Sequence, residues 1–285
     1  AFESQLMPKG AGPREALWIP SIQYSSADRT IYAPDLKKQS IFHISDYGTA
    51  SPVVETVLSY ITQSESDSII LQGQIVRMAN GLFIAANTTQ RGMIAEFDSS
   101  GNPIATRVPF PDKSRIDATL TDWANTNLYY PNLKVSPDGK FAVSLYDMSD
   151  MGIFMTVDGE ELNYKVVDGA SPNDIYVAQS GSDLVQGFAT KKTRLYTQDL
   201  TLSDKYAYQL YIDMTKEEIA DTDFFKDTKR NGAKTVRVFD REGNCVKKIY
   251  LDNWVKYVAV SPDDRYLYAL TESSEYGFTL LRYAL

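Results

Sequence analysis

Residues 136–143 of this chain read SPDGKFAV and residues 261–268 read SPDDRYLY, so one pattern recurs after 125 positions. In each copy, Pro-Asp followed by Gly or Asp suits a tight reversal of the chain, and the aromatic-rich residues that follow suit a β-strand. A β unit that repeats along a chain is typical of a propeller or a solenoid. The repeat therefore predicts an all-β scaffold and leaves function to the loops that differ between copies.

Three weaker copies extend the repeat, at Ser26–Tyr32, Met78–Ile84 and Leu202–Tyr208. When the turn residues of all five copies are aligned at positions 28, 80, 138, 204 and 263, they are separated by 52, 58, 66 and 59 residues. This spacing predicts four-stranded units with generous loops, somewhat longer than the roughly 40 to 50 residues of compact propeller blades.

A second pattern follows the first, as FDSSGN at residues 97–102 and FDREGN at residues 239–244, with reduced versions at 157–159 and 45–48. Each copy predicts a strand, a turn in which Gly supplies a positive φ, and another strand. Together the two patterns predict the four strands of a blade. The first two strands are best seen at 254–260 and 265–271, and the last two at 234–239 and 244–250.

The last blade has three strands, ending at Phe278–Leu285, and Phe2–Met7 is expected to supply the fourth strand and close the ring. Five copies of the pattern are visible, but residues 168–200 hold more strand-like runs than one blade needs. We therefore expect a single β-propeller domain over residues 1–285, with six blades favoured and five as the alternative.

Composition excludes several classes of protein. The 285 residues are 43% hydrophobic, enough for one large all-β core, and 29 Lys and Arg against 37 Asp and Glu give a net charge of -8. That charge repels a phosphate backbone, so nucleic acid is not an expected partner. No apolar run approaches the roughly 18 residues of a transmembrane helix. Cys245 is the only cysteine, which excludes an intrachain disulfide.

Two insertions depart from the repeat. Residues 110–127 predict a polar loop between blades, and residues 215–231 predict a helix that begins with a capping box at Thr215–Glu218 and stands on one face of the ring. A scaffold needs neither insertion to fold, so we expect recognition there. Aromatic side chains in the two insertions are the candidate anchors for a ligand or partner. They are Trp123, Phe224 and Phe225.

Residues 10–15 read GAGPRE, which resembles the Gly-x-Gly-Pro-x-Glu loop of six-bladed propellers abundant in gut Bacteroidetes-type bacteria. Together with the two repeated patterns, the whole chain resembles the TolB-like six-bladed propeller family. Members of that family are mostly uncharacterised, and many look like exported lipoproteins or periplasmic proteins. The resemblance implies an extracytoplasmic setting, periplasmic or anchored to the outer membrane, with a lipid anchor upstream of this sequence. It implies no reaction.

Candidate catalytic and metal-binding residues are few. His43 is the single histidine, and no Gly-x-Ser-x-Gly elbow accompanies it, so the pattern favours a structural histidine and assigns no catalytic residue. The densest carboxylates, Asp221, Asp223 and Asp227, lack the spacing of an EF-hand loop and favour a solvated helix face. No metal and no cofactor is expected.

The leading hypothesis is therefore a non-catalytic, extracytoplasmic β-propeller that binds a protein partner or a glycan through loops on one face. The alternative is a metal-dependent propeller hydrolase, lactonase or lyase that uses the central channel. Several acids and amides on the innermost strands would favour the alternative.

Overall fold

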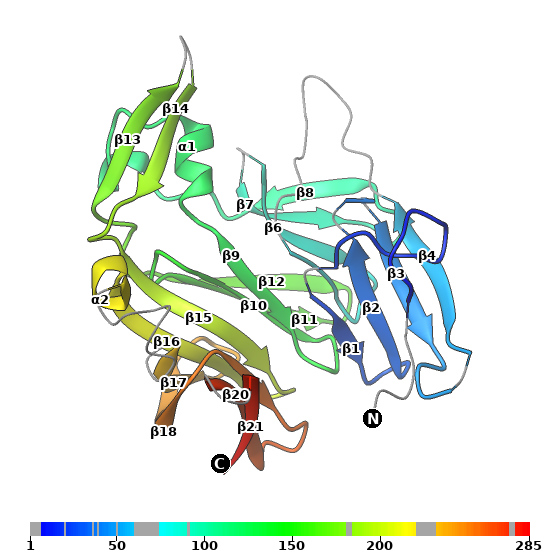
Figure 1. Ribbon diagram of the computed structural model, residues 1–285. Coiled ribbons are helices and arrows are strands. Elements are labelled where there is room, and N and C mark those ends of the chain that lie inside the picture. The colour runs from blue at the N-terminus through cyan, green and yellow to red at the C-terminus, as the bar shows by residue number, and fades with distance from the viewer. Residues whose placement is uncertain are drawn as a thin grey trace.

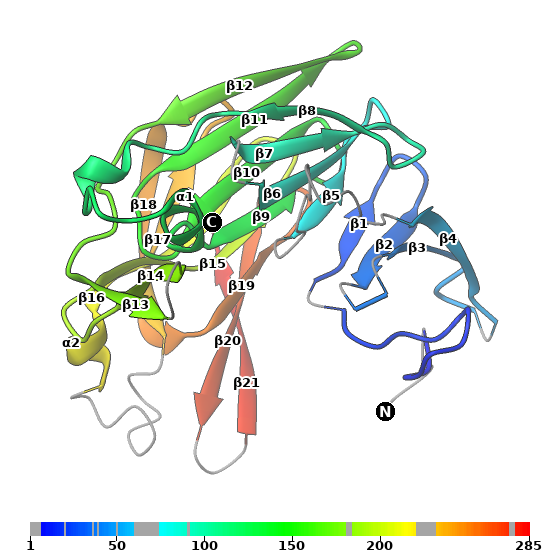
Figure 2. The same ribbon diagram turned by 90° about the horizontal axis from the view of Figure 1, so that it is seen from above.

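The computed structural model describes residues 7–19, 21–35, 37–38, 40–49, 51–59, 74–89, 92–180, 184–220, 232–273 and 277–285. Five small antiparallel sheets are arranged around a common axis (Figures 1 and 2), which confirms the predicted β-propeller. In each sheet the strands follow one another in chain order, so that every sheet is a meander of the kind expected for a propeller blade.

We number the sheets as blades 1 to 5. Blade 1 contains β1 (Gln23–Ser25), β2 (Thr30–Asp35), β3 (Ser40–Ser45) and β4 (Val53–Ser59). Blade 2 contains β5 (Ile75–Arg77), β6 (Phe83–Thr89), β7 (Gly92–Phe97) and β8 (Pro103–Arg107). Blade 3 contains β9 (Pro131–Val135), β10 (Phe141–Tyr146), β11 (Gly152–Asp158) and β12 (Glu161–Val167). Blade 4 contains β15 (Arg194–Leu202), β16 (Ala207–Thr215), β17 (Ala233–Phe239) and β18 (Cys245–Val255). Blade 5 contains β19 (Tyr257–Val260), β20 (Tyr266–Ser273) and β21 (Gly277–Ala284).

The repeated turn joins the first and second strands of every blade. All five aligned positions, 28, 80, 138, 204 and 263, lie in these turns. Gly139 has a φ of +71°, as an Asp-Gly reversal requires, and Asp264 adopts a φ of +56° at the equivalent position of blade 5. The second predicted pattern joins the third and fourth strands, so both turn patterns are confirmed.

The surplus strands of residues 168–200 form a hairpin instead of a blade. It consists of β13 (Ile175–Ser180) and β14 (Leu184–Ala189), which pair only with each other. The first strands of blades 3 and 4, β9 and β15, are in direct contact, so the hairpin is not placed between them in the ring. The described part of the chain therefore forms five blades.

The core lies between the blades, because each sheet has two apolar faces. One cluster fills the space between blades 2 and 3, and others lie between blades 1 and 2, 3 and 4, and 4 and 5. Middle strands such as β2, β7 and β10 are buried at every residue, whereas the outer strand β12 has mainly exposed or half-buried residues. Strands buried on both faces read as continuous apolar runs rather than as an alternation.

The predicted closing strand, Phe2–Met7, falls outside the described residues except for Met7, which packs against an apolar cluster on blade 1. Among the described residues, β21 has only β20 as a neighbour. Its side chains Phe278 and Leu280 are 57% and 67% exposed. No helix in the described ranges is long and apolar enough to span a bilayer.

Candidate functional site

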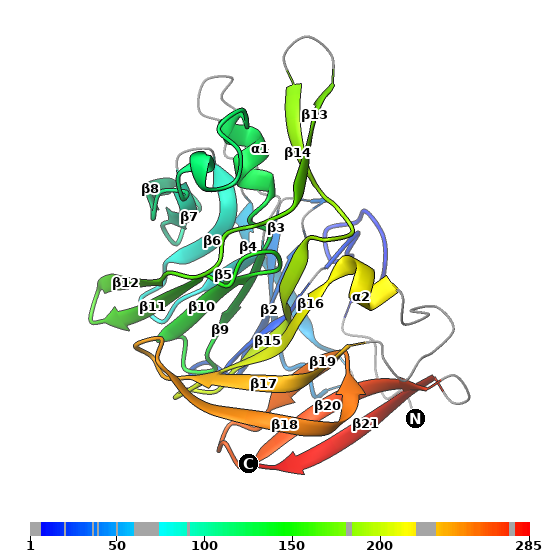
Figure 3. The ribbon, with the colours of Figure 1, turned by 90° about the vertical axis from the view of Figure 1, so that its left-hand side faces the viewer.

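Three additions to the blades lie on one side of the ring, which we call the insertion face. They are α1 (Asp122–Asn127), the β13–β14 hairpin and α2 (Lys216–Ala220), seen together in Figures 1 and 3. Their common position follows from the topology. Helix α1 and the hairpin precede the first strands of blades 3 and 4, and α2 follows the second strand of blade 4. First strands begin, and second strands end, at the same side of a propeller.

Residues 110–127 differ from the polar loop that the sequence predicts, because they contain a 3-10 turn at Lys113–Arg115 and helix α1. Leu120, Ala124 and Leu128 recur at every fourth position and are buried in the core between blades 2 and 3. This spacing gives the segment one apolar side and explains why it packs on the ring. Trp123 lies in α1, and its side chain is outside the described part of the structure.

The capping box predicted at the start of the second insertion is confirmed. The Glu218 amide donates a hydrogen bond of 3.1 Å to Thr215 Oγ1, and the Thr215 amide donates one of 2.6 Å to Glu218 Oε2. Residues 221–231 lie outside the described ranges. The candidate anchors Phe224 and Phe225, and the carboxylates of that segment, therefore remain sequence predictions.

The β13–β14 hairpin has one buried and one exposed side. Ile175 and Val177 pack against the core between blades 2 and 3. Tyr176 and Phe188 are directly opposite each other across the two strands, on the other side of the hairpin, and are 62% and 47% exposed. Sequence reasoning missed this pair, although aromatic residues at the outward positions of an alternating strand were a readable signal.

Amides and one acid on the innermost strands hold neighbouring blades together. The side chain of Gln23 accepts a hydrogen bond of 2.9 Å from the Arg77 amide and donates one of 2.8 Å to the Arg77 carbonyl oxygen. Gln74 Oε1 accepts a hydrogen bond of 2.9 Å from the Leu133 amide. These side chains are of the types that an enzyme in the channel would use, but their polar atoms are engaged in joining one blade to the next.

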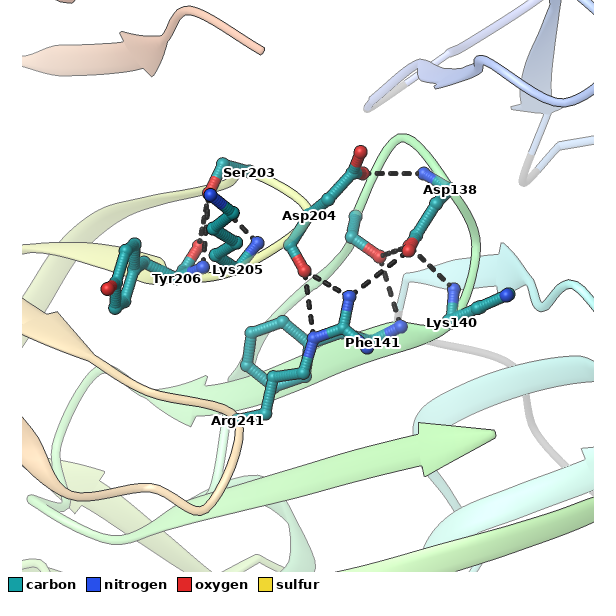
Figure 4. A network of polar contacts seen from close by, with 9 residues as sticks. Asp138, Lys140, Phe141, Ser203, Asp204, Lys205, Tyr206 and Arg241 are labelled. Atoms are coloured by element: carbon teal, nitrogen blue, oxygen red, sulfur yellow. Dashed lines mark hydrogen bonds and ion pairs between the residues drawn. The ribbon is translucent and has the colours of Figure 1, made fainter. Parts of the chain in front are cut away.

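The turns at the opposite end of the ring from the insertion face are also joined. Figure 4 shows that the Asp138 amide donates a hydrogen bond of 2.8 Å to Asp204 Oδ1. Arg241 Nε donates a bond of 2.8 Å to the Asp204 carbonyl oxygen, and Arg241 Nη2 lies 3.1 Å from Asp138 Oδ2. The network connects the repeated turns of blades 3 and 4, so the Asp residues of these turns have structural partners.

His43 lies on β3, as the sequence predicts, with Nδ1 at 3.7 Å from Glu55 Oε2 and its ring centroid at 5.2 Å from that of Tyr32. These neighbours suit a histidine that packs on the sheet. Within the described ranges, no group of three or more His, Cys, Asp or Glu residues is arranged to hold a metal ion.

Asp147 is the carboxyl group with the largest change in acidity. It follows β10 on the side of the insertion face, and burial raises its pKa to about 7. Asn132 Nδ2 donates a hydrogen bond of 2.5 Å to Asp147 Oδ1, and this bond partly opposes the effect of burial on the pKa.

The blades, their chain order and the interblade cores define a β-propeller. The model of the TolB-like 6-blade propeller-like family matches residues 1–263, and the chain belongs to this family. The family description names six blades, against the five in the described part of this chain.

Solved structures support the fold alone. A member of the DUF4221 family from Bacteroides vulgatus has 10% identity and a TM-score of 0.52, with 97% of this chain and 82% of that chain covered. A protein from Lactobacillus plantarum has 11% identity and a TM-score of 0.44, and this chain spans 92% of itself and 66% of that protein. The Cps50 (Swd1) β-propeller domain from Myceliophteria thermophila has 12% identity and a TM-score of 0.46, with coverages of 94% and 83%. Comparison with curated protein sequences gives no match.

Proposed function

We propose that this protein is a non-catalytic, extracytoplasmic propeller that binds a protein partner or a glycan through its insertion face. The observation that carries the proposal is the exposed pair of Tyr176 and Phe188 on the β13–β14 hairpin. Exposed aromatic side chains bury a large apolar area at a low cost in side-chain entropy, and they are enriched among the residues that dominate binding energy.

The hairpin holds this pair rigidly. Ile175 and Val177 fix its inner side on the core, and a Cβ on Gly187 would lie 3.1 Å from the side chain of Leu128, so the hairpin packs closely beside α1. A pair of aromatic rings on a fixed platform loses little freedom on binding. The extracytoplasmic setting rests on the family resemblance.

The test compares the full chain with the double variant Tyr176→Ser, Phe188→Ser. The control is Tyr250→Ser, which removes a ring that is 76% exposed on the outer strand β18. A glycan array and photo-crosslinking from position 176 or position 250 supply the two readouts. We expect the double variant to lose about tenfold or more in glycan signal or in crosslinked partner, while the control keeps both. Equal binding by all three proteins would overturn the proposal.

Two further variants test the original candidate anchors on the same face. Replacing residues 215–231 by a short Gly-containing turn, or changing Trp123→Ala, should leave the fold intact and weaken binding. If both altered proteins retain full binding while the Tyr176 and Phe188 variant does not, recognition is confined to the hairpin.

A further inference from the structure

A cavity of about 360 Å³ lies on the axis of the ring, apart from the insertion face. All five innermost strands contribute to its wall, which is mainly apolar. Apolar side chains in the wall include Ile22, Ile75, Leu133, Leu200 and Tyr257. Sites for small molecules in proteins are typically concave and mostly apolar, with volumes of roughly 300 to 1,000 Å³ and a few polar groups that orient the ligand.

Turns from different blades meet at one end of this cavity. Pro137, in the repeated turn of blade 3, lines the cavity, and its carbonyl oxygen accepts a hydrogen bond of 2.8 Å from the Ser26 amide of blade 1. The Ala79 amide of blade 2 donates a bond of 2.8 Å to the Gly139 carbonyl oxygen in the same turn. The backbone at this end is therefore fixed by three blades, and the cavity does not depend on the insertions for its shape.

Two charged side chains, Lys134 and Asp199, line the cavity, and their situations differ. The Asp199 carboxylate accepts a hydrogen bond of 2.8 Å from the Val258 amide, so it is part of the wall. Lys134 lies on β9 between Leu133 and Val135 and is half-buried. Among the described residues, no hydrogen bond or ion pair engages its ammonium group.

We propose that the channel binds a small organic carboxylate, with the carboxylate against Lys134 and an apolar body against the surrounding side chains. A single ammonium group complements a single negative charge. Phosphate recognition commonly uses an Arg fork or several backbone amides, and an apolar wall would desolvate a doubly charged group at high cost. The chemistry of the wall therefore favours a monocarboxylate over a phosphate ester.

The test titrates the full chain with 3-phenylpropionate and with the neutral 3-phenylpropionamide, followed by ligand-observed NMR and calorimetry. We expect the carboxylate to bind about tenfold more tightly than the amide, which corresponds to about 1.4 kcal/mol. Lys134→Met should abolish this preference, and Lys134→Arg should keep it because the charge remains. Lys140→Met, which removes an exposed lysine of the neighbouring turn, is the matched control and should behave as the parent does.

Three results would overturn the proposal: equal affinities for the carboxylate and the amide, an unchanged preference in Lys134→Met, or no saturable binding of 3-phenylpropionate, butyrate or hexanoate at about 10 mM, a concentration above typical ligand affinities. Thermal unfolding of each variant is measured first. If Lys134→Met does not fold, the comparison of carboxylate with amide on the parent protein and on Lys134→Arg still decides the result. Loss of partner binding through the insertion face would leave this outcome unaffected.

Discussion

The Asp199 carboxylate accepts a 2.8 Å hydrogen bond from the backbone amide of Val258, and so the innermost strand of blade 4 holds that of blade 5. Burial raises the pKa of Asp199, and the bonds from the amides of Val258 and Leu200 act in the opposite direction. The group is thus a buried acceptor whose partner would lose its only described acceptor if the side chain were removed.

Two substitutions of Asp199 separate hydrogen bonding from charge. Asp199→Leu leaves the Val258 amide without an acceptor in a buried site and should lower the free energy of unfolding by about 1 to 3 kcal/mol. Asp199→Asn keeps an acceptor oxygen and removes the buried charge, so its stability should stay within about 1 kcal/mol of the parent. Denaturant titration measures both. A Leu variant as stable as the parent would show that this bond does not hold the blades together.

Gly139 and Gly159 offer a matched pair for the repeated turn. Both have positive φ, +71° and +60°, but a Cβ on Gly139 would lie 2.9 Å from the Ala79 amide nitrogen, whereas one on Gly159 would meet nothing within 4 Å. Gly159→Val should therefore cost only backbone strain, of the order of 1 to 2 kcal/mol. Gly139→Val should cost more, because it also pushes the turns of blades 2 and 3 apart. Denaturant midpoints in the reverse order would contradict this account.

The turns were predictable from the sequence because their chemistry is local. Asp138 and Gly139 specify a reversal by their own backbone preferences, and all five copies could be aligned on such residues. The hairpin at Ile175–Ala189 was not predictable, because its alternation is the same as that of a blade strand and only its packing on α1 distinguishes it. Register and sheet membership of such strands are decided by tertiary contacts.

The candidate sites were predictable only in part. The position of the second insertion and its capping box at Thr215 follow from local sequence. The channel wall does not, because Asp199 and Val258 are 59 residues apart in the chain and meet only after two blades have formed. Asp199 precedes the turn residue Asp204 by five positions, as Val258 precedes Asp263, so the repeat itself held the signal that these residues are neighbours.

Asp147 should make stability depend on pH. Its pKa is about 7 in the folded protein and 3.8 in its ordinary state, so the folded protein binds a proton more tightly than the unfolded chain. The stabilisation from this proton is present in full below about pH 4 and is lost as pH rises through 7. The difference between the two pKa values sets an upper limit of about 4 kcal/mol.

The measurement is the difference in the free energy of unfolding between the parent and Asp147→Asn, followed from pH 4.5 to 8.5. We expect the parent to lose stability relative to the variant as pH rises, because Asn cannot ionise, and the difference to level off above about pH 8. Asp158→Asn, a change at an exposed turn, serves as the control and should show a nearly constant difference. A flat difference for Asp147→Asn would mean that its carboxyl group titrates near its ordinary value.

The last prediction concerns closure of the ring by Phe2–Met7. If this segment pairs with β21, deleting residues 1–8 leaves that strand as an open edge beside the exposed Phe278 and Leu280, and should destabilise the protein by several kcal/mol or cause it to aggregate. The alternation of a strand supplies a matched pair of variants that keep the chain length. Phe2→Ser with Leu6→Ser removes the apolar side of the segment and should reproduce much of the loss, whereas Glu3→Ser with Gln5→Ser changes the other side and should not. Thermal unfolding and light scattering measure both effects. A truncated protein that melts with the parent and stays monodisperse, or two double variants of equal stability, would show that Phe2–Met7 does not close the ring.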